Sequence, residues 1–282
     1  MWKRSSAVLI LLFVLIFVLQ CKKEKAPVEP KTGVRALVDT VGFAQYAWQM
    51  DSLMTRIQRL QKKKLLSAIT QGKITPQTEF KVAVCPHDDY GYVGYLYPAV
   101  MEGIKAKTVI IFGVAHKARL LNLENQIIFD TYPQWHGIFG PMQVSNIREE
   151  IIKALPDNVY QINDSMQTIE HSVEALLPFL QYYRRDRQFV SILVPYMPFE
   201  RMQEIARPLA KAIAKVMKKR NWQWAKTWRW SSARTPCITE IKTGVVKILP
   251  ITELIPLATA RQWSTKRRSS IPVWPGRCRK KN

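Results

Sequence analysis

Between residues 34 and 224, short apolar runs alternate with helical patterns, and this alternation limits the possible folds more than any other feature of the chain. Apolar runs of strand length occur at 80–85, 107–114, 125–130 and 188–196. Helical patterns separate and follow them at 145–155, 172–183 and 199–220. Strands that alternate with helices favour an α/β domain whose mostly parallel sheet is flanked by helices. We therefore expect one such domain over residues 34–224, with a kink at Pro208 in its last helix.

Two of the four histidines follow predicted strands directly. His87 comes just after the apolar run 80–85, and His116 comes just after the run 107–114. In parallel sheets, reactive groups gather beyond the carboxyl ends of the strands. A single histidine at such a place is more often a structural hydrogen-bonding group, but two of them favour a transition-metal site, because imidazole is the commonest ligand of these ions. Two ligands alone are one or two short of a complete site.

Four stretches carry a resemblance to a known family. They are "VRALVDTVGFA" (34–44), "PHDDYGYVG" (86–94), "IIFGVAHK" (110–117) and "IEHSVEALLPFLQYY" (169–183). In this order they resemble the signatures of the Memo family, whose bacterial members are called AmmeMemoRadiSam system protein B. The resemblance implies a fold similar to that of the class III extradiol dioxygenases, which hold non-haem iron. It also implies a metal-dependent redox or dioxygenase-like pocket with iron or copper as the cofactor.

The same resemblance implies catalytic roles for four residues. His87 and His116 match the two active-site histidines that hold the metal, while Glu170 and His171 match a Glu-His-Ser element that orients ligands or handles protons. The chain departs from the family pattern at Asp88 and Asp89, where Ala-Gly is common, and at Lys117, where a second histidine often follows. An acid at 88 or 89 either orients a histidine or lies exposed in a turn.

A second interpretation is a binding module without turnover. The family resemblance extends to a member implicated in peptide recognition, and it implies partners among the AmmeMemoRadiSam system proteins. Four tyrosines lie close together in the sequence, namely Tyr90, Tyr92, Tyr95 and Tyr97. They either line a ligand pocket or belong to the core and its turns. The sequence does not identify the small molecule or peptide that such a pocket would hold.

Residues 1–21 have the layout of an export signal. A charged start precedes an apolar run from Ala7 to Leu19, and Cys21 closes it. The run is shorter than the about 20 residues that span a bilayer. It resembles a bacterial lipoprotein signal, in which the cysteine is lipidated, although Gln20 stands where a small residue is preferred. We expect an exported, membrane-anchored lipoprotein with a polar linker at 22–33; an uncleaved N-terminal anchor is the alternative.

The net charge of +22 invites a nucleic-acid interpretation, but its distribution argues against one. Residues 225–282 hold 13 of the 43 Lys and Arg residues and only 2 of the 21 Asp and Glu residues. A nucleic-acid binder places its basic residues on a folded face with aromatic residues or a recognisable module, whereas this segment has no structural pattern. We therefore expect no nucleic-acid partner. The four cysteines form neither a CxxC pair nor a disulfide framework.

The patterned sequence ends at Trp224. The Memo family has a further signature beyond this point, a buried strand that ends in Ser-x-Asp with a histidine three residues later, and residues 225–282 lack it. A shift of the reading frame by one nucleotide near Ala225 accounts for the loss. Each codon of the other frame combines the third base of one present codon with the first two of the next. With ordinary codon choices the stretch then reads "EDLALVISTDAVHYGD", which contains the missing signature.

We therefore interpret residues 225–282 as an out-of-frame, disordered basic tail on an incomplete domain; a genuine basic tail is the alternative. The metal site would keep His87 and His116 without a third ligand. Loss of a central strand exposes a sheet edge and apolar surface, so we expect an unstable chain with little activity. A non-functional remnant of a frameshift is thus a third interpretation, beside the metal protein and the binding module.

Overall fold

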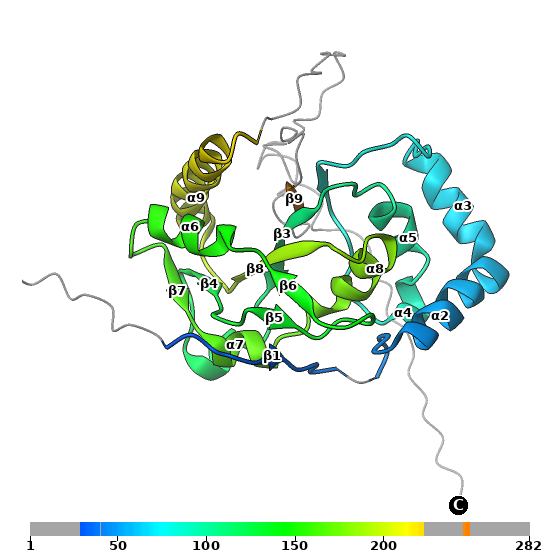
Figure 1. Ribbon diagram of the computed structural model, residues 1–282, viewed down its shortest axis with the longest axis horizontal. Helices are drawn as coiled ribbons and strands as arrows, with labels where there is room; N and C mark the ends of the chain where they lie inside the picture. The colour runs from blue at the N-terminus through cyan, green and yellow to red at the C-terminus, as the bar shows by residue number, and fades with distance from the viewer. Residues whose placement is uncertain (1–28, 40, 223–244, 249–282) are drawn as a thin grey trace, which may run out of the picture.

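The computed structural model describes residues 29–39, 41–222 and 245–248 (Figure 1). A mostly parallel sheet runs through the middle of the molecule, and helices cover both of its faces. This arrangement confirms the α/β fold class that the alternating sequence pattern predicts.

The strands of the sheet pair in the order β1 (Val34–Arg35), β5 (Gln134–Trp135), β6 (Met142–Val144), β8 (Gln188–Val194), β3 (Thr108–Val114), β9 (Val245–Ile248) and β2 (Val82–Ala83). Neighbours on this path are parallel, except that β5 and β6 are antiparallel. Two further strands, β4 (Ile127–Phe129) and β7 (Tyr160–Ile162), are parallel to each other. β4 joins β8 through one antiparallel bridge between Ile128 and Leu193.

The helices of the described chain are α2 (Ala47–Leu60), α3 (Lys62–Gln71), α4 (Tyr90–Val93), α5 (Leu96–Met101), η1 (Ala118–Leu121), α6 (Ile147–Ala154), α7 (Asp164–Ile169), η2 (Glu174–Leu176), α8 (Leu177–Tyr183) and α9 (Phe199–Lys219). In Figure 1, α6 and α9 lie on one side of the sheet, while α2, α3, α5 and α8 lie on the other. α9 is a single helix that continues through Pro208.

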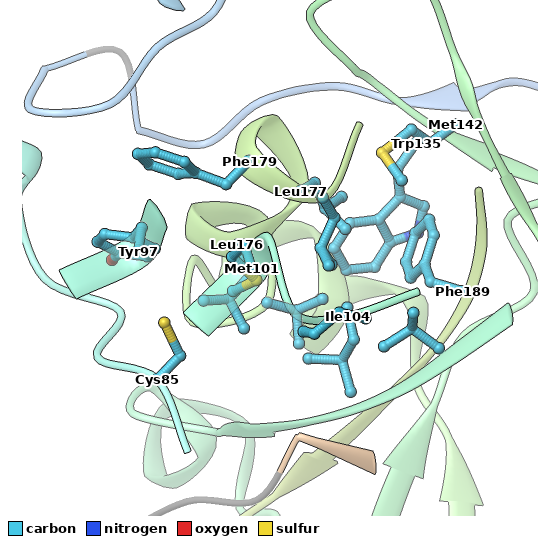
Figure 2. Close-up of a cluster of buried hydrophobic side chains, with 14 of the residues drawn as sticks. Cys85, Tyr97, Met101, Ile104, Trp135, Met142, Leu176, Leu177, Phe179 and Phe189 are labelled. Atoms are coloured by element: carbon cyan, nitrogen blue, oxygen red, sulfur yellow. The ribbon is translucent and has the colours of Figure 1, made fainter. Parts of the chain in front are cut away.

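The two faces of the sheet carry separate apolar cores, because successive side chains of a strand point to opposite faces. In β3, Val109 and Ile111 belong to the core beneath α2, α3, α5 and α8. Ile110 and Phe112 belong to the core beneath α6 and α9. Figure 2 shows the first of these cores, in which the rings of Tyr97 and Phe179 stack with centroids 4.7 Å apart and Trp135 packs edge-on against Phe189.

β9 comes from the segment that the sequence analysis interprets as an out-of-frame tail. The sequence pattern predicts no strand there, and the structure differs at these four residues, which pair in parallel with both β3 and β2. Pairing requires only backbone groups, so a segment without helical or strand periodicity can still supply it. β2 pairs with no strand other than β9 in the described chain, so these four residues attach β2 to the sheet.

Several predictions concern residues that the structure does not describe. The expected signal over 1–21, with Cys21, lies outside the described residues, as does most of the linker at 22–33. The rest of the expected tail, 223–244 and 249–282, lies outside them as well. The boundary at residue 224 and the reading-frame hypothesis therefore stay predictions. Among the described helices, none has both the length and the apolar character needed to cross a membrane.

Candidate metal site

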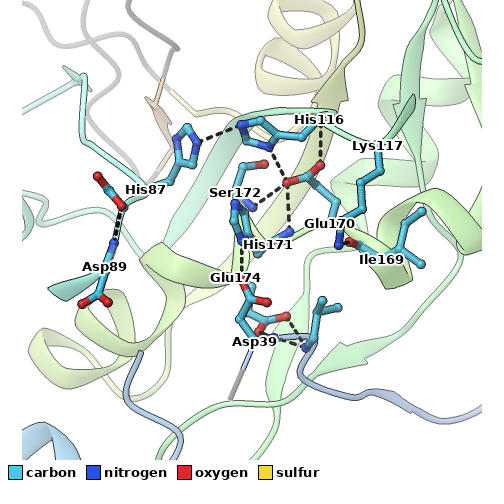
Figure 3. Close-up of polar contacts among 12 residues, drawn as sticks. Asp39, His87, Asp89, His116, Lys117, Ile169, Glu170, His171, Ser172 and Glu174 are labelled. Atoms are coloured by element: carbon cyan, nitrogen blue, oxygen red, sulfur yellow. Dashed lines mark hydrogen bonds and ion pairs between the residues drawn. The ribbon is translucent and has the colours of Figure 1, made fainter. Parts of the chain in front are cut away.

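Three histidines from three separate segments meet at one edge of the sheet. His87 follows β2, His116 follows β3, and His171 lies between α7 and η2. One ring nitrogen from each lies within 4.8 Å of the others (Figure 3). His87 and His116 meet as the sequence predicts, because the carboxyl ends of parallel strands share an edge.

A glycine in β3 allows the segment that carries His171 to approach. A Cβ atom at Gly113 would lie 2.5 Å from the Ser172 hydroxyl and 2.7 Å from a Val173 methyl group, closer than real contacts allow. Because glycine has only a hydrogen atom in place of a side chain, the 170–173 segment can pack directly on β3. The Ser172 hydroxyl also donates to the Val114 carbonyl at 2.9 Å, which fixes the segment against β3.

Glu170 joins two of the histidines. Its side chain is 2% exposed and accepts from the His116 backbone N–H at 2.7 Å and from His116 Nδ1 at 2.9 Å. It also accepts from the backbone N–H groups of His171 and Ser172 at 2.9 and 3.0 Å. Burial raises the pKa of this carboxyl, but the hydrogen bonds from His116 and Ser172 outweigh burial and leave the pKa below its ordinary value. Glu170 is therefore an ionised acceptor.

His171 has a carboxylate partner of its own. Its Nδ1 contacts Asp39, a residue of the N-terminal segment that the sequence analysis did not single out. A carboxylate has no hydrogen to donate, so Nδ1 carries the proton in both His116 and His171. The Nε2 atoms of these two rings are then left with a free lone pair, the state in which imidazole binds a metal.

The spacing between His87 and His116 fits a shared metal ion. His87 Nε2 and His116 Nε2 are 3.2 Å apart. Two nitrogens bound at about 2.1 Å to one ion in tetrahedral or octahedral geometry are about 3.0–3.4 Å apart. Three imidazoles with carboxylates behind two of them are a donor set for iron, copper or zinc. The residues present therefore fit the metal that the resemblance implies.

The environment keeps His87 neutral over a wider range of pH. Burial lowers the pKa of this imidazole below its ordinary value of 6.5, and the positive charges that His116 and His171 acquire on protonation lower it further. A neutral ring presents a lone pair rather than a proton to a cation. The cluster therefore favours metal binding over protonation at neutral pH.

The sequence alone predicts a site that lacks a third ligand, whereas the structure places a third histidine beside the first two. That prediction assumes that the third histidine belongs to the absent strand signature and assigns His171 to proton handling. Instead, His171 places a ring nitrogen beside those of His87 and His116. The carboxylate of Glu170 holds the side chain of His116 and only the backbone of His171.

The sequence left open whether Asp88 or Asp89 orients a histidine or lies in a turn. The structure answers this question for Asp89. Asp89 is the N-cap of α4 and accepts from the Gly91 backbone N–H at 2.6 Å, so it is a turn acid. Asp88 accepts from the Asp89 backbone N–H at 2.8 Å. Lys117 donates to the Ile169 carbonyl at 3.0 Å, beside the Glu170 segment.

The four tyrosines divide between core and surface. Tyr90 and Tyr97 are buried, and their hydroxyls donate to the carbonyls of Ala175 and Asp88 at 2.5 and 3.0 Å. The bond from Tyr97 anchors the turn next to His87. Tyr92 is exposed, so the set forms no continuous lining. The core interpretation fits Tyr90 and Tyr97.

The fold and the site together define a class of protein, a mostly parallel α/β domain with a three-histidine cluster at the carboxyl ends of its strands. The sequence model of the Memo-like protein family matches residues 54–223, which include all three histidines. The chain belongs to the Memo family.

Curated relatives carry the same family name. A MEMO1 family protein of Methanosarcina barkeri is 27% identical over 139 residues, which is 49% of this chain and 49% of that protein. One of Pyrobaculum aerophilum is 28% identical over 138 residues, 46% of each chain. One of Saccharolobus islandicus is 32% identical over 143 residues, 48% of this chain and 46% of that protein. The chain thus matches about half the length of these relatives.

Proposed function

We propose that this protein binds one transition-metal ion, iron or copper, through His87, His116 and His171, and that the ion forms a redox or dioxygenase-like centre. The observation that carries the proposal is the convergence of three imidazole nitrogens within 4.8 Å. Imidazole suits both metals, and three protein ligands leave coordination positions for a small ligand. The His116 side chain is 43% exposed, so such a ligand can reach the cluster from solvent.

The protein residues around the cluster have distinct tasks in this proposal. A bound ion supplies Lewis acidity and, for iron or copper, electron transfer. Glu170 and Asp39 hold the rings of His116 and His171 with Nε2 facing the ion and place negative charge behind them. Among the described residues, no carboxylate is hydrogen-bonded to the ring of His87, and the lowered pKa of this ring keeps its lone pair available.

Metal titration of the full-length protein tests the proposal. We expect about one equivalent of Fe(II), added without oxygen, or of Cu(II) to remain bound after gel filtration and to be counted by elemental analysis. His87→Ala and His116→Ala should each lose most of this metal, because two-nitrogen sites bind far less securely. His136→Ala is the matched control, since His136 Nε2 contacts the Gln45 carbonyl at 3.1 Å, outside the cluster.

Two results would overturn the proposal. A folded protein that takes up no metal would favour the binding-module interpretation, in which the pocket holds a peptide or partner without turnover. Equal metal uptake in the wild type and in a His87→Ala, His116→Ala double variant would place the metal elsewhere. Circular dichroism of each variant shows whether the chain is folded when it is titrated.

We also infer that a lipid on Cys21 tethers the protein to a membrane after export, and that its partners belong to the AmmeMemoRadiSam system. The layout of residues 1–21 supports the tether, and family membership supports the partners. Labelling of cells with a clickable palmitate analogue should mark the wild type and not Cys21→Ser. A labelled Cys21→Ser chain would contradict the tether, and co-purification with the other proteins of the system tests the partners.

A further inference from the structure

The segment over residues 34–39, here called the N-terminal strap, is held to the site by one buried arginine. Arg35 is 1% exposed, and its guanidinium lies 4.1 Å from the centre of the Trp135 ring. Its Nε donates to the Gln167 carbonyl at 2.8 Å, and Nη2 donates to the Glu170 carbonyl at 2.6 Å. The strap is therefore bonded to the backbone that leads directly into His171.

A buried carboxylate completes this attachment. Glu174 pairs with Arg35 Nη1, and both side chains are almost fully buried. The carboxylate of Glu174 also accepts from the backbone N–H groups of Val38 and Asp39 at 3.0 and 3.2 Å. Glu174 lies three residues after His171, so the acid that holds the strap belongs to the same segment as the histidine. Charge-assisted bonds of this kind are the strongest that side chains make to backbone.

The result of these contacts is the position of Asp39. With its backbone held by Glu174, Asp39 directs its carboxylate at Nδ1 of His171, as Figure 3 shows. The two residues are 132 positions apart in the sequence. His171 is otherwise 35% exposed, and its nearest aromatic neighbour outside the cluster is Phe43, with centroids 6.0 Å apart. The contact with Asp39 is therefore the hydrogen bond that fixes the orientation of this partly exposed ring.

We propose that Asp39 is a positioning residue that makes His171 the third metal ligand, an inference that rests on the proposed function. The carboxylate fixes the Nδ1–H tautomer and turns Nε2 toward His87 and His116. Glu170 does the same for His116. Without Asp39, His171 would lose its fixed orientation and the site would fall back to two ligands. Contacts of this kind contribute about 10- to 100-fold to metal affinity.

Imidazole NMR of the metal-free, full-length protein tests the tautomer directly. At about pH 8, above the ordinary pKa of about 6.5 for a histidine side chain, two-bond ¹⁵N–¹H correlations distinguish protonated Nδ1 from protonated Nε2. We expect the Nδ1–H form for His171 in the wild type and its loss in Asp39→Ala. Asp39→Asn, whose amide oxygen can still accept, should retain it in part. An unchanged tautomer in Asp39→Ala would overturn the inference whether or not the protein binds metal.

Copper binding tests the consequence. We expect Asp39→Ala to weaken Cu(II) affinity about tenfold or more and to reduce the equatorial nitrogen ligands seen in the EPR hyperfine pattern from three to two. His171→Ala should have the same effect, and the double variant should be no weaker than either single variant. Asp51→Ala, an exposed acid in α2, is the control. Additive losses would show that Asp39 does not act through His171, whereas a wild type that takes up neither copper nor iron would refute the proposed function instead.

Discussion

At the scale of single residues, Glu170 explains how the Glu-His-Ser stretch works. Its carboxylate receives four N–H groups, two of them from His116 and two from its own chain neighbours. The same side chain therefore fixes the ring orientation of His116 and the backbone of His171. An acid buried to this degree stays ionised because its acceptor positions are filled by donors.

We expect the metal-free protein to lose stability as the pH falls below about 6.5, in part through His87. Burial, and then the charges on His116 and His171, hold the folded pKa of His87 below 6.5. The unfolded chain therefore binds the proton at a higher pH than the folded chain. Protonation then favours unfolding as the pH falls through the unfolded value. Urea unfolding at about pH 7.5 and about pH 5.5 measures the loss, which should be smaller in His87→Gln.

His136→Gln provides the comparison for this experiment, because it removes a histidine outside the cluster. It should lose as much stability on acidification as the wild type. The same pH dependence in His87→Gln and the wild type would show that His87 does not contribute to it.

The candidate ligands could be predicted in part from the sequence. His87 and His116 follow apolar runs, and a strand end in a parallel sheet is a recognisable place for reactive groups. Asp39 has no such signal, because its position depends on Glu174, 135 residues away. His171 was recognised through its motif, but its place beside the other two histidines depends on the tertiary contact of its segment with β3.

At the scale of secondary-structure elements, the contact between β3 and the 170–173 segment makes a further prediction. Gly113→Ala should destabilise the fold by about 1–3 kcal/mol, because the new methyl group overlaps Ser172 and Val173. The shift of that segment should also weaken metal binding, since it carries both Glu170 and His171. Urea unfolding and copper titration of the variant measure the two effects.

Gly33→Ala is the matched control, because a Cβ atom at that position meets nothing within 4 Å. It should behave as the wild type in both measurements. If Gly113→Ala retained full stability and copper affinity, the close approach would not be what positions the segment.

The strands themselves differ in how well the sequence predicts them. β3 and β8 are seven residues each and buried on both faces, so each reads as a continuous apolar run. The expected runs at 80–85 and 125–130 shorten to the two- and three-residue strands β2 and β4. β1, β5, β6 and β7 are equally short and were not predicted, because their pairing depends on partners and not on local periodicity.

At the scale of the whole molecule, the reading-frame hypothesis predicts a more stable protein when one base is inserted near the Ala225 codon. The restored strand would bring its own apolar side chains and the Ser-x-Asp signature into the sheet. We expect the corrected chain to remain soluble and to unfold at higher urea than the chain as written. Sequencing of the gene and transcript across residues 224–225 shows whether one more base is present there than the chain as written implies, and equal stability of both chains would argue that the present tail is genuine.

The position that β9 occupies between β3 and β2 sets the starting distance between two histidines of the cluster. Parallel strands are about 4.8 Å apart whatever their side chains, because backbone hydrogen bonds fix the distance. β3 and β2 are separated by one strand, so the backbones that lead to His116 and His87 start about 10 Å apart, and the two imidazoles close that gap. Any strand between β3 and β2 would therefore give the same spacing between His87 and His116. The amino-acid sequence of that strand would instead affect the stability of the fold.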